Sequence, residues 1–406
     1  MSTEPAQLIQ PTPEQEEQGF SGLQGIYERA GGAFVPLAAT ALAFFIGGLV
    51  VLITGHNPVS AYRAMFQGAG FNWFFPWVQG DARTAASGHL QQTLNESTPL
   101  MLTALAVAFA FRCGLFNIGG QGQYWIGFLA SLWVGTHLNG LNRPAHIALG
   151  LLAGILGGAV WGGIAGLLRA TVGAHEVITT IMLNWIAIWG GQWLVEQGGP
   201  LQGPVAALPR SSLIDQAARL WTVWGTIPGL ALHAGIFVAL AALVVYYLIL
   251  GRTTLGFEVR AVGFNPDAAR YGGIPVRRSY FLALAIAGAF AGVAGAVNLM
   301  GVKYSVDTSD FGSSVAFTGI AVALLGRNKA VGIFFAALLF AGLDTGTSTR
   351  ALDASIFDPS LATDLATIIQ ALVIFFVGAE LLIIYLWRAR RYLRIRPAPR
   401  EKAVAP

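Results

Sequence analysis

The chain has 406 residues and a formal net charge of +4; 55% of its residues are hydrophobic and only 11% are charged. An average soluble domain carries about 25% charged residues. The hydrophobic core of a water-soluble protein of this size cannot bury so much apolar surface. Composition therefore excludes an ordinary soluble protein, and the small net charge gives no reason to expect nucleic-acid binding.

The two ends of the chain differ from the middle. Residues 1–30 are polar and acidic, whereas a secretory signal begins with basic residues and a short apolar run. They predict a disordered cytoplasmic tail followed by a retained first helix. Residues 389–406 predict a second cytoplasmic tail, which is basic, so that residues 31–388 form the transmembrane domain.

Ten apolar runs predict an all-α polytopic membrane protein. Each approaches the roughly 17–25 residues that a helix needs to cross a bilayer, and polar or glycine-rich breaks separate them. The expected spans are 33–54, 95–112, 120–137, 146–169, 177–196, 231–250, 279–301, 311–326, 330–349 and 365–387.

Lysine and arginine give the orientation of these helices. With the N-terminus inside, 17 of the 24 lysines and arginines fall on the cytoplasmic side and 7 fall outside. Because cytoplasmic loops are enriched in these residues, we expect both termini to be cytoplasmic. Two long outer loops, about 55–94 and 197–230, are expected to pack over the outer surface or to contact a partner protein.

The segment FNIGGQGQ (116–123) breaks an apolar stretch and carries Asn117 and Gln121. Irregular backbone at membrane depth survives only where protein buries it or where it lines a water-filled cavity. Transporters use such breaks to present backbone groups to a substrate. An ordinary cytoplasmic turn between two helices explains the pattern equally well.

Glycine recurs every four residues along the expected helix 146–169, which places four glycines on one helical face. Such a stripe lets a neighbouring helix pack backbone against backbone, and a sliding surface for gating is the alternative. The four helix-packing residues are Gly154, Gly158, Gly162 and Gly166.

The segment AHEVITTIMLNW (174–185) places Glu176, Thr180 and Asn184 on one face of a helix that starts at the cytoplasmic edge. Polar groups within the membrane usually face the bundle interior or a watery pathway. Hydrogen bonding between helices is an equally good explanation. Glu176 also suits the first turn, where the helix dipole favours a carboxylate.

The cytoplasmic loop 251–278 predicts a helix of about two turns. Asn265 is a good N-cap, Pro266 suits the first helical position, and Asp267 lies at the positive end of the dipole. Gly272 and the glycine after it supply a stop. Because a short isolated helix is unstable in water, this one is expected to pack against anionic lipid or a cytosolic partner.

Several patterns are absent from the sequence. There is no GxxxxGK[ST] loop, so the chain does not bind ATP in the P-loop manner. Six scattered histidines and one cysteine form no zinc pattern, and no nucleophile elbow is present. The sequence predicts no catalytic residue, no metal site and no cofactor.

Four segments carry a resemblance to a known family. ALAVAFAFRCGLFNIGGQGQYWIG (104–127), AHEVITTIMLNWIA (174–187), GFEVRAVGFNPDAARYGGI (256–274) and GIAVALLGRNKAVGI (319–333) resemble the permeases of bacterial ABC importers for nucleosides and simple sugars. That group lies close to the ribose-type and branched-chain amino acid permeases. The resemblance implies a type II-like importer fold in the bacterial inner membrane.

The resemblance also implies partners: cytosolic ATP-binding subunits, a second permease that is the same chain or a different one, and a periplasmic or lipid-anchored solute-binding protein. ATP hydrolysis would take place on the ATPase partner, and this chain would be a transport subunit. Residues matching the family's ATPase-coupling segment are Arg260, Gly263, Asn265, Ala268, Ala269, Gly272 and Ile274.

The expected mechanism is alternating access, in which ATP binding draws two coupling helices together and the bundles rock between two packed states. Nucleosides are the expected solute, and simple sugars are the alternative. The candidates for lining or shaping the path are Asn117, Gln121, Glu176, Thr180 and Asn184.

Two other classes stay open. An ion-coupled secondary transporter would need intramembrane carboxylates, and only Glu176 and Glu380 qualify on the sequence. A membrane enzyme acting on lipid-linked sugars would need a clustered acidic metal-binding loop, and none stands out.

Overall fold

The computed structural model describes residues 34–205, 207–226, 230–348 and 359–379, and nearly all regular structure in this part is helical. The expected tails 1–30 and 389–406 lie outside it, as does Glu380. The helices are α2 (Phe34–Ile53), α3 (Pro58–Gly68), α4 (Gly80–Arg112), α5 (Gly120–His137), α6 (Arg143–Val172), α7 (Glu176–Val195), α8 (Gly235–Arg252), α9 (Thr254–Phe264), α10 (Pro266–Tyr271), α11 (Val276–Asn298), α12 (Val315–Leu325), α13 (Ala330–Gly346) and α14 (Pro359–Gly378).

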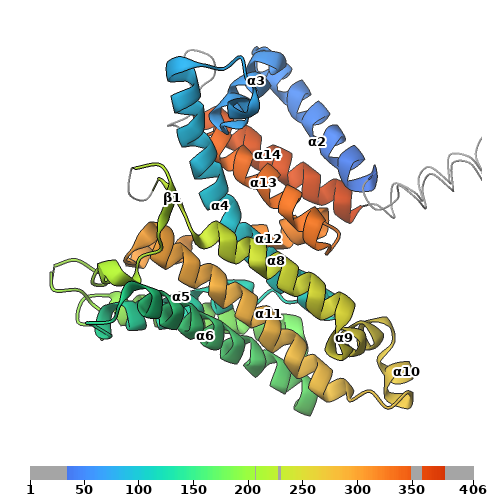
Figure 1. The fold of residues 1–406 in the computed structure, drawn as a ribbon. Coiled ribbons are helices and arrows are strands. Elements are labelled where there is room, and N and C mark those ends of the chain that lie inside the picture. The colour runs from blue at the N-terminus through green and yellow to red at the C-terminus, as the bar shows by residue number, and fades with distance from the viewer. Residues whose placement is uncertain (1–33, 206, 227–229, 349–358, 380–406) are drawn as a thin grey trace, which may run out of the picture.

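Helix α4 lies at the centre of the bundle (Figure 1). On one side of it, α5, α6 and α11 pack against one another, with α7 against α5 and α6. On the other side, α2 packs on α14 and α3 packs on α13, while α12 and α13 both contact α4. Its most apolar stretch is accordingly 83% buried, the largest share of any candidate span among the described residues. Because α4 contacts both groups of helices, a movement of α4 would displace helices on both sides.

Within the described residues, each of the ten expected spans overlaps a helix. Seven helices in the described part are long and apolar enough to cross a membrane, which establishes a multi-pass membrane protein. The apolar stretches of α13 and α14 are shorter, and α5 begins with the polar sequence GQGQ. A total of ten membrane crossings therefore stays an expectation.

Most of the expected outer loop 55–94 is helical, and the hydropathy pattern did not predict these helices. Helix α3 begins there because the side chain of Asn57 accepts a hydrogen bond from the backbone N–H of Val59 at 2.9 Å, with Pro58 at the first helical position. Helix α4 starts at Gly80, well before the expected residue 95. Neither α3 nor the first part of α4 forms a continuous apolar run, so hydropathy does not predict them as spans.

The glycine stripe of α6 lies directly against α11. A methyl group added to Gly158 would overlap the carbonyl oxygen of Gly288, and one on Gly162 would overlap that of Leu284. Gly292 has the same relation to the carbonyl oxygen of Gly154. The two backbones touch along this line, which leaves no room for any side chain.

The described part of segment 197–230, which is the expected outer segment, packs over the loop that follows α11. The backbone N–H of Ser211 donates to Val306 at 2.8 Å, and that of Ile214 donates to Tyr304 at 2.9 Å. A short antiparallel pair joins β1 (Thr222–Trp224) to β2 (Leu232–His233). Burial lowers the pKa of His233 to about 4, so this side chain stays neutral at physiological pH.

Candidate functional site

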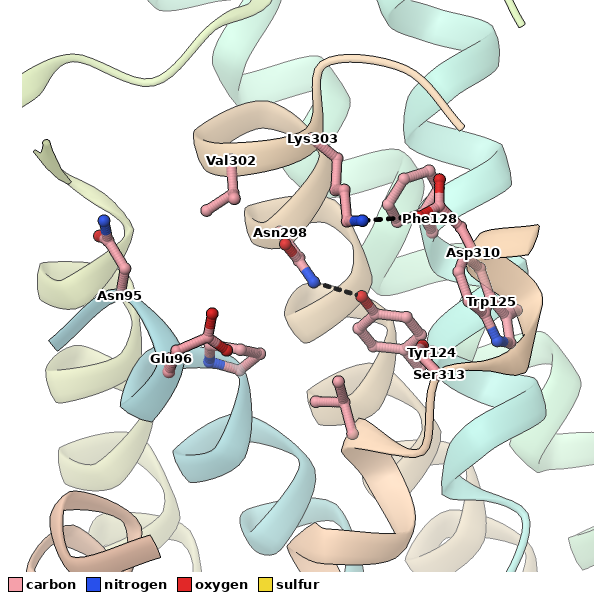
Figure 2. Close-up of a pocket in the computed structure, with 12 residues that line it drawn as sticks. Asn95, Glu96, Tyr124, Trp125, Phe128, Asn298, Val302, Lys303, Asp310 and Ser313 are labelled. Carbon is pink, nitrogen blue, oxygen red and sulfur yellow. Dashed lines mark hydrogen bonds and ion pairs between the residues drawn. The ribbon is translucent and has the colours of Figure 1, made fainter. Parts of the chain in front are cut away.

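A pocket opens between α4, α5 and the outer end of α11, and we call it the α4–α11 pocket (Figure 2). Its empty space, with the open mouth included, is about 570 Å³. Its lining combines aromatic, amide and charged side chains. The lining residues are Asn95, Glu96, Pro99, Tyr124, Trp125, Phe128, Asn298, Val302, Lys303, Asp310, Ser313 and Val315.

Helix α4 brings Glu96 to the pocket. The neighbouring Asn95 donates from its side chain to the carbonyl oxygens of Leu230 and Ala231, both at 3.1 Å, and so fixes this turn to the outer segment. Pro99 has no N–H, so the carbonyl of Asn95 lacks its usual helical donor. Figure 2 shows Glu96 across the pocket from the aromatic side chains of α5.

The opposite wall is aromatic and is supplied by one turn of α5. Tyr124 and Trp125 meet edge to face at 5.1 Å between ring centroids, and Trp125 lies 5.3 Å from Phe128. The side-chain amide of Asn298 on α11 donates to the hydroxyl of Tyr124 at 2.6 Å. Aromatic faces beside a few fixed polar groups are typical of sites for small organic ligands.

Lys303 and Asp310 form an ion pair at the pocket, 2.6 Å apart. Lys303 ends a π-helical turn, Leu299–Lys303, that extends α11; such turns are frequent at functional sites. Asp310 belongs to a capping box with Asp307. The hydroxyl of Ser309 donates to Asp307 and holds the pKa of that carboxyl below its usual range.

None of the five predicted path residues lines the pocket, and three of them, Asn117, Gln121 and Asn184, belong to a buried hydrogen-bond network around residues 113–123. Asn117 exchanges side-chain hydrogen bonds with Gln123 at 2.9 and 3.1 Å. The amide oxygen of Asn184 accepts from the backbone N–H of Gly122 at 2.7 Å, and its nitrogen donates to Ile118 at 2.9 Å. These bonds satisfy the irregular backbone between α4 and α5.

Gln121 connects this network to the pocket. Its side chain donates to the carbonyl oxygen of Ser313 at 2.7 Å and accepts from the N–H of Ala316 at 3.1 Å, so it fixes the start of α12. Thr180 bonds within its own helix, and Glu176 pairs with Arg169 at 3.5 Å. The role of the five residues in translocation stays a prediction.

Replacing Asn184 with alanine tests whether this residue stabilises the fold or lines the translocation path. The change leaves two buried backbone groups without partners, at a cost of about 1–3 kcal/mol each. We expect both the thermal unfolding midpoint of the detergent-solubilised protein and the uptake rate to fall. The control Asn139→Ala, at an exposed position, should change neither. Lost uptake at an unchanged midpoint would instead assign Asn184 to the path.

Sequence reasoning missed the residues that line the pocket. Glu96 lies just inside the expected span 95–112, in the run LNESTP, and a carboxylate within a predicted span is the signal that was available. Lys303 was counted only as an outer-side charge. Asn298 and Asp310 gave no signal, because the fold alone brings them beside α4 and α5.

The coupling segment forms two short helices, α9 and α10, rather than one (Figure 1). The predicted cap is confirmed: the side chain of Asn265 accepts from the N–H groups of Asp267 and Ala268, both at 3.0 Å. After α10, the N–H of Gly272 donates to Ala268 at 2.9 Å, and that of Ile274 donates to Ala269 at 2.9 Å.

One side of α9 and α10 is held by the bundle and the other is open. Gly263 packs on the carbonyl of Arg112 at the end of α4 so closely that a methyl group there would overlap it. Arg112 donates in turn to the carbonyl of Asn328 at 2.9 Å. The side chains of Phe264 and Tyr271 are 96% and 98% exposed. Exposed aromatic side chains beside a capped turn are unusual unless another molecule covers them.

Residues 89–378 match the family described as the branched-chain amino acid transport system permease component. The chain belongs to this permease family. The match covers every element that lines the pocket and both helices of the coupling segment. The permease is thus a multi-pass transport protein of the ABC type, which argues against transport driven by an ion gradient.

Individual relatives match over nearly the whole permease. It is 37% identical to the guanosine ABC transporter permease protein NupP of Bacillus subtilis (strain 168), over 85% of this chain and 93% of the relative. It is 34% identical to the nucleoside permease protein NupB of Lactococcus lactis, over 91% and 96%. It is 35% identical to the glucose permease protein TsgB13 of Haloferax volcanii, over 84% and 86%. No solved structure matches significantly.

Proposed function

We propose that this permease is the membrane subunit of an ABC importer that carries nucleosides across the bacterial inner membrane. The observation that carries the proposal is the α4–α11 pocket, whose wall pairs the aromatic turn of α5 with amide and carboxylate side chains. The similarity to guanosine and nucleoside permeases points to the same solute.

The charges of the pocket favour an uncharged solute. Lys303 is the only cation among the described lining residues, and Asp310 already pairs with it. An amino acid would need a free cation for its carboxylate. A nucleoside or a sugar needs hydroxyl partners and an apolar face, which Glu96, Asn298 and the aromatic residues supply.

A simple sugar is the second candidate, because the glucose permease TsgB13 is as similar as the nucleoside permease NupB. The nucleoside is favoured because two of these three relatives are described as guanosine or nucleoside permeases and one as a glucose permease.

The proposed assembly has two permeases, cytosolic ATP-binding subunits below α10, and a solute-binding protein above the outer segment. Both chain termini would be cytoplasmic. The ATPase would push on α10, and α9 would pass the movement to Arg112 at the inner end of α4. From Arg112 to Glu96 that helix rises about 24 Å at 1.5 Å per residue. One helix would thus link the ATPase to the pocket. Pro99 interrupts its hydrogen bonding, so this helix would bend most easily there.

The proposal is tested by uptake of radiolabelled guanosine into cells that express the permease together with its proposed ATPase, second permease and binding protein. We expect uptake to stop on ATP depletion and to be competed by unlabelled adenosine but not by leucine. Competition by glucose rather than by adenosine would favour the sugar importer. Uptake that survives ATP depletion would contradict the proposal.

A further inference from the structure

Glu96 differs from the other carboxylate of the α4–α11 pocket. Asp310 is occupied, because it pairs with Lys303 at 2.6 Å and accepts from the backbone N–H of Asp307 at 3.1 Å. The oxygens of Glu96 take no hydrogen bond and no ion pair within the described part of the chain, and its side chain is exposed to the pocket. A carboxylate at membrane depth without a partner is costly and marks a functional position.

The groups opposite Glu96 also have unused hydrogen-bonding capacity. Asn298 gives its amide N–H to Tyr124, which leaves its carbonyl oxygen without a donor from any described residue. The hydroxyl of Tyr124 accepts that bond, so its own hydrogen remains available. A ligand that fills the pocket would complete these bonds.

The geometry restricts the kind of ligand. Two vicinal hydroxyls are adjacent donors, and a carboxylate with two free oxygens accepts both at once. Val302 and Val315 are half-buried and supply apolar surface for a planar base, beside the almost fully buried rings of Tyr124 and Phe128. The lining side chains carry a formal charge of −1, from Glu96 and Asp310 against Lys303, which disfavours a phosphorylated ligand.

We propose that the α4–α11 pocket binds a ribonucleoside in transit, with the 2′- and 3′-hydroxyls of the ribose donating to Glu96 and the base lying against the aromatic wall of α5 (Figure 2). This inference rests on the proposed function and adds to it that the permease itself, and not only a binding protein, distinguishes ribose from deoxyribose. Glu96 is the specificity-determining residue.

The test compares uptake of guanosine and 2′,3′-dideoxyguanosine by the complete importer carrying either wild-type permease or Glu96→Gln. The amide replaces one acceptor oxygen with a donor, so guanosine uptake should fall about 10- to 100-fold. Dideoxyguanosine lacks both hydroxyls, and its uptake should change less than about twofold. The ratio of guanosine uptake to dideoxyguanosine uptake should therefore fall in the variant by nearly the same factor as guanosine uptake itself.

The ratio is insensitive to folding, because a poorly folded variant would take up less of both substrates. It is also insensitive to the binding protein, because wild type and variant are measured with the same one. Asp81→Asn is the matched control: Asp81 is also an exposed carboxylate of α4, in its first turn, and it does not line the pocket. This control should retain the wild-type ratio.

An unchanged ratio in Glu96→Gln overturns the assignment of Glu96, even where guanosine uptake itself is normal. Absence of nucleoside uptake by the wild-type importer would instead overturn the proposed function, so the two failures are distinguishable. Equal loss of the ratio in Asp81→Asn would also contradict the inference, because it would show a general effect of charge.

Discussion

Replacing Gly158 with leucine is expected to remove most of the folded permease. Its position has no free volume, since even a methyl group would overlap the carbonyl oxygen of Gly288 on α11. Overpacking a core that can adjust costs about 1–3 kcal/mol. Here the obstacle is backbone rather than a side chain that can change rotamer, so α6 and α11 would have to separate along their whole contact.

The measurement is fluorescence-detected size-exclusion chromatography of the permease in mild detergent, with total expression as the reference. Gly190→Leu is the matched control, because Gly190 lies inside α7 and nothing is within 4 Å of an added Cβ. We expect Gly190→Leu to give a wild-type peak and Gly158→Leu to aggregate or disappear. A monodisperse Gly158→Leu protein with normal thermal stability would mean that the two helices do not pack this closely.

The membrane helices were predictable because hydropathy is a property of single segments. Each expected span matches a helix, and the boundaries of α5 agree at both ends with the expected 120–137. The glycine spacing of α6 was likewise visible, although its partner α11 was not. The miss in residues 55–94 has the same cause: α3 buries only one face, so it carries no long apolar run.

The candidate site was less predictable because it is assembled from distant segments. A polar residue within an apolar stretch shows that a side chain needs a partner, but not whether that partner is protein or solute. Asn184 and Gln121 gave the stronger sequence signal, and both are fully engaged with backbone groups. Glu96 gave a weaker signal and has no such bonds. Only the three-dimensional contacts distinguish the two situations.

Replacing Ala268 with arginine is expected to lower uptake strongly while leaving the permease folded. Ala268 is exposed on α10, and its backbone N–H is held by Asn265, so a longer side chain projects outward without disturbing the cap. If α10 docks into a groove of the ATPase, the added bulk and charge obstruct docking. Coupling between sites is typically worth about 5- to 150-fold, and we expect uptake to fall within that range.

The measurements are guanosine uptake, ATP hydrolysis by the purified complex, and thermal stability of the permease. Thr171→Arg is the control, because it adds the same charge to an exposed position at the end of α6, away from α10. The expected pattern is low uptake with altered ATP hydrolysis in Ala268→Arg alone, at wild-type stability in both variants. Normal uptake and hydrolysis in Ala268→Arg would show that the motor acts elsewhere. The contact between Gly263 and Arg112 would then be only a structural support for α4.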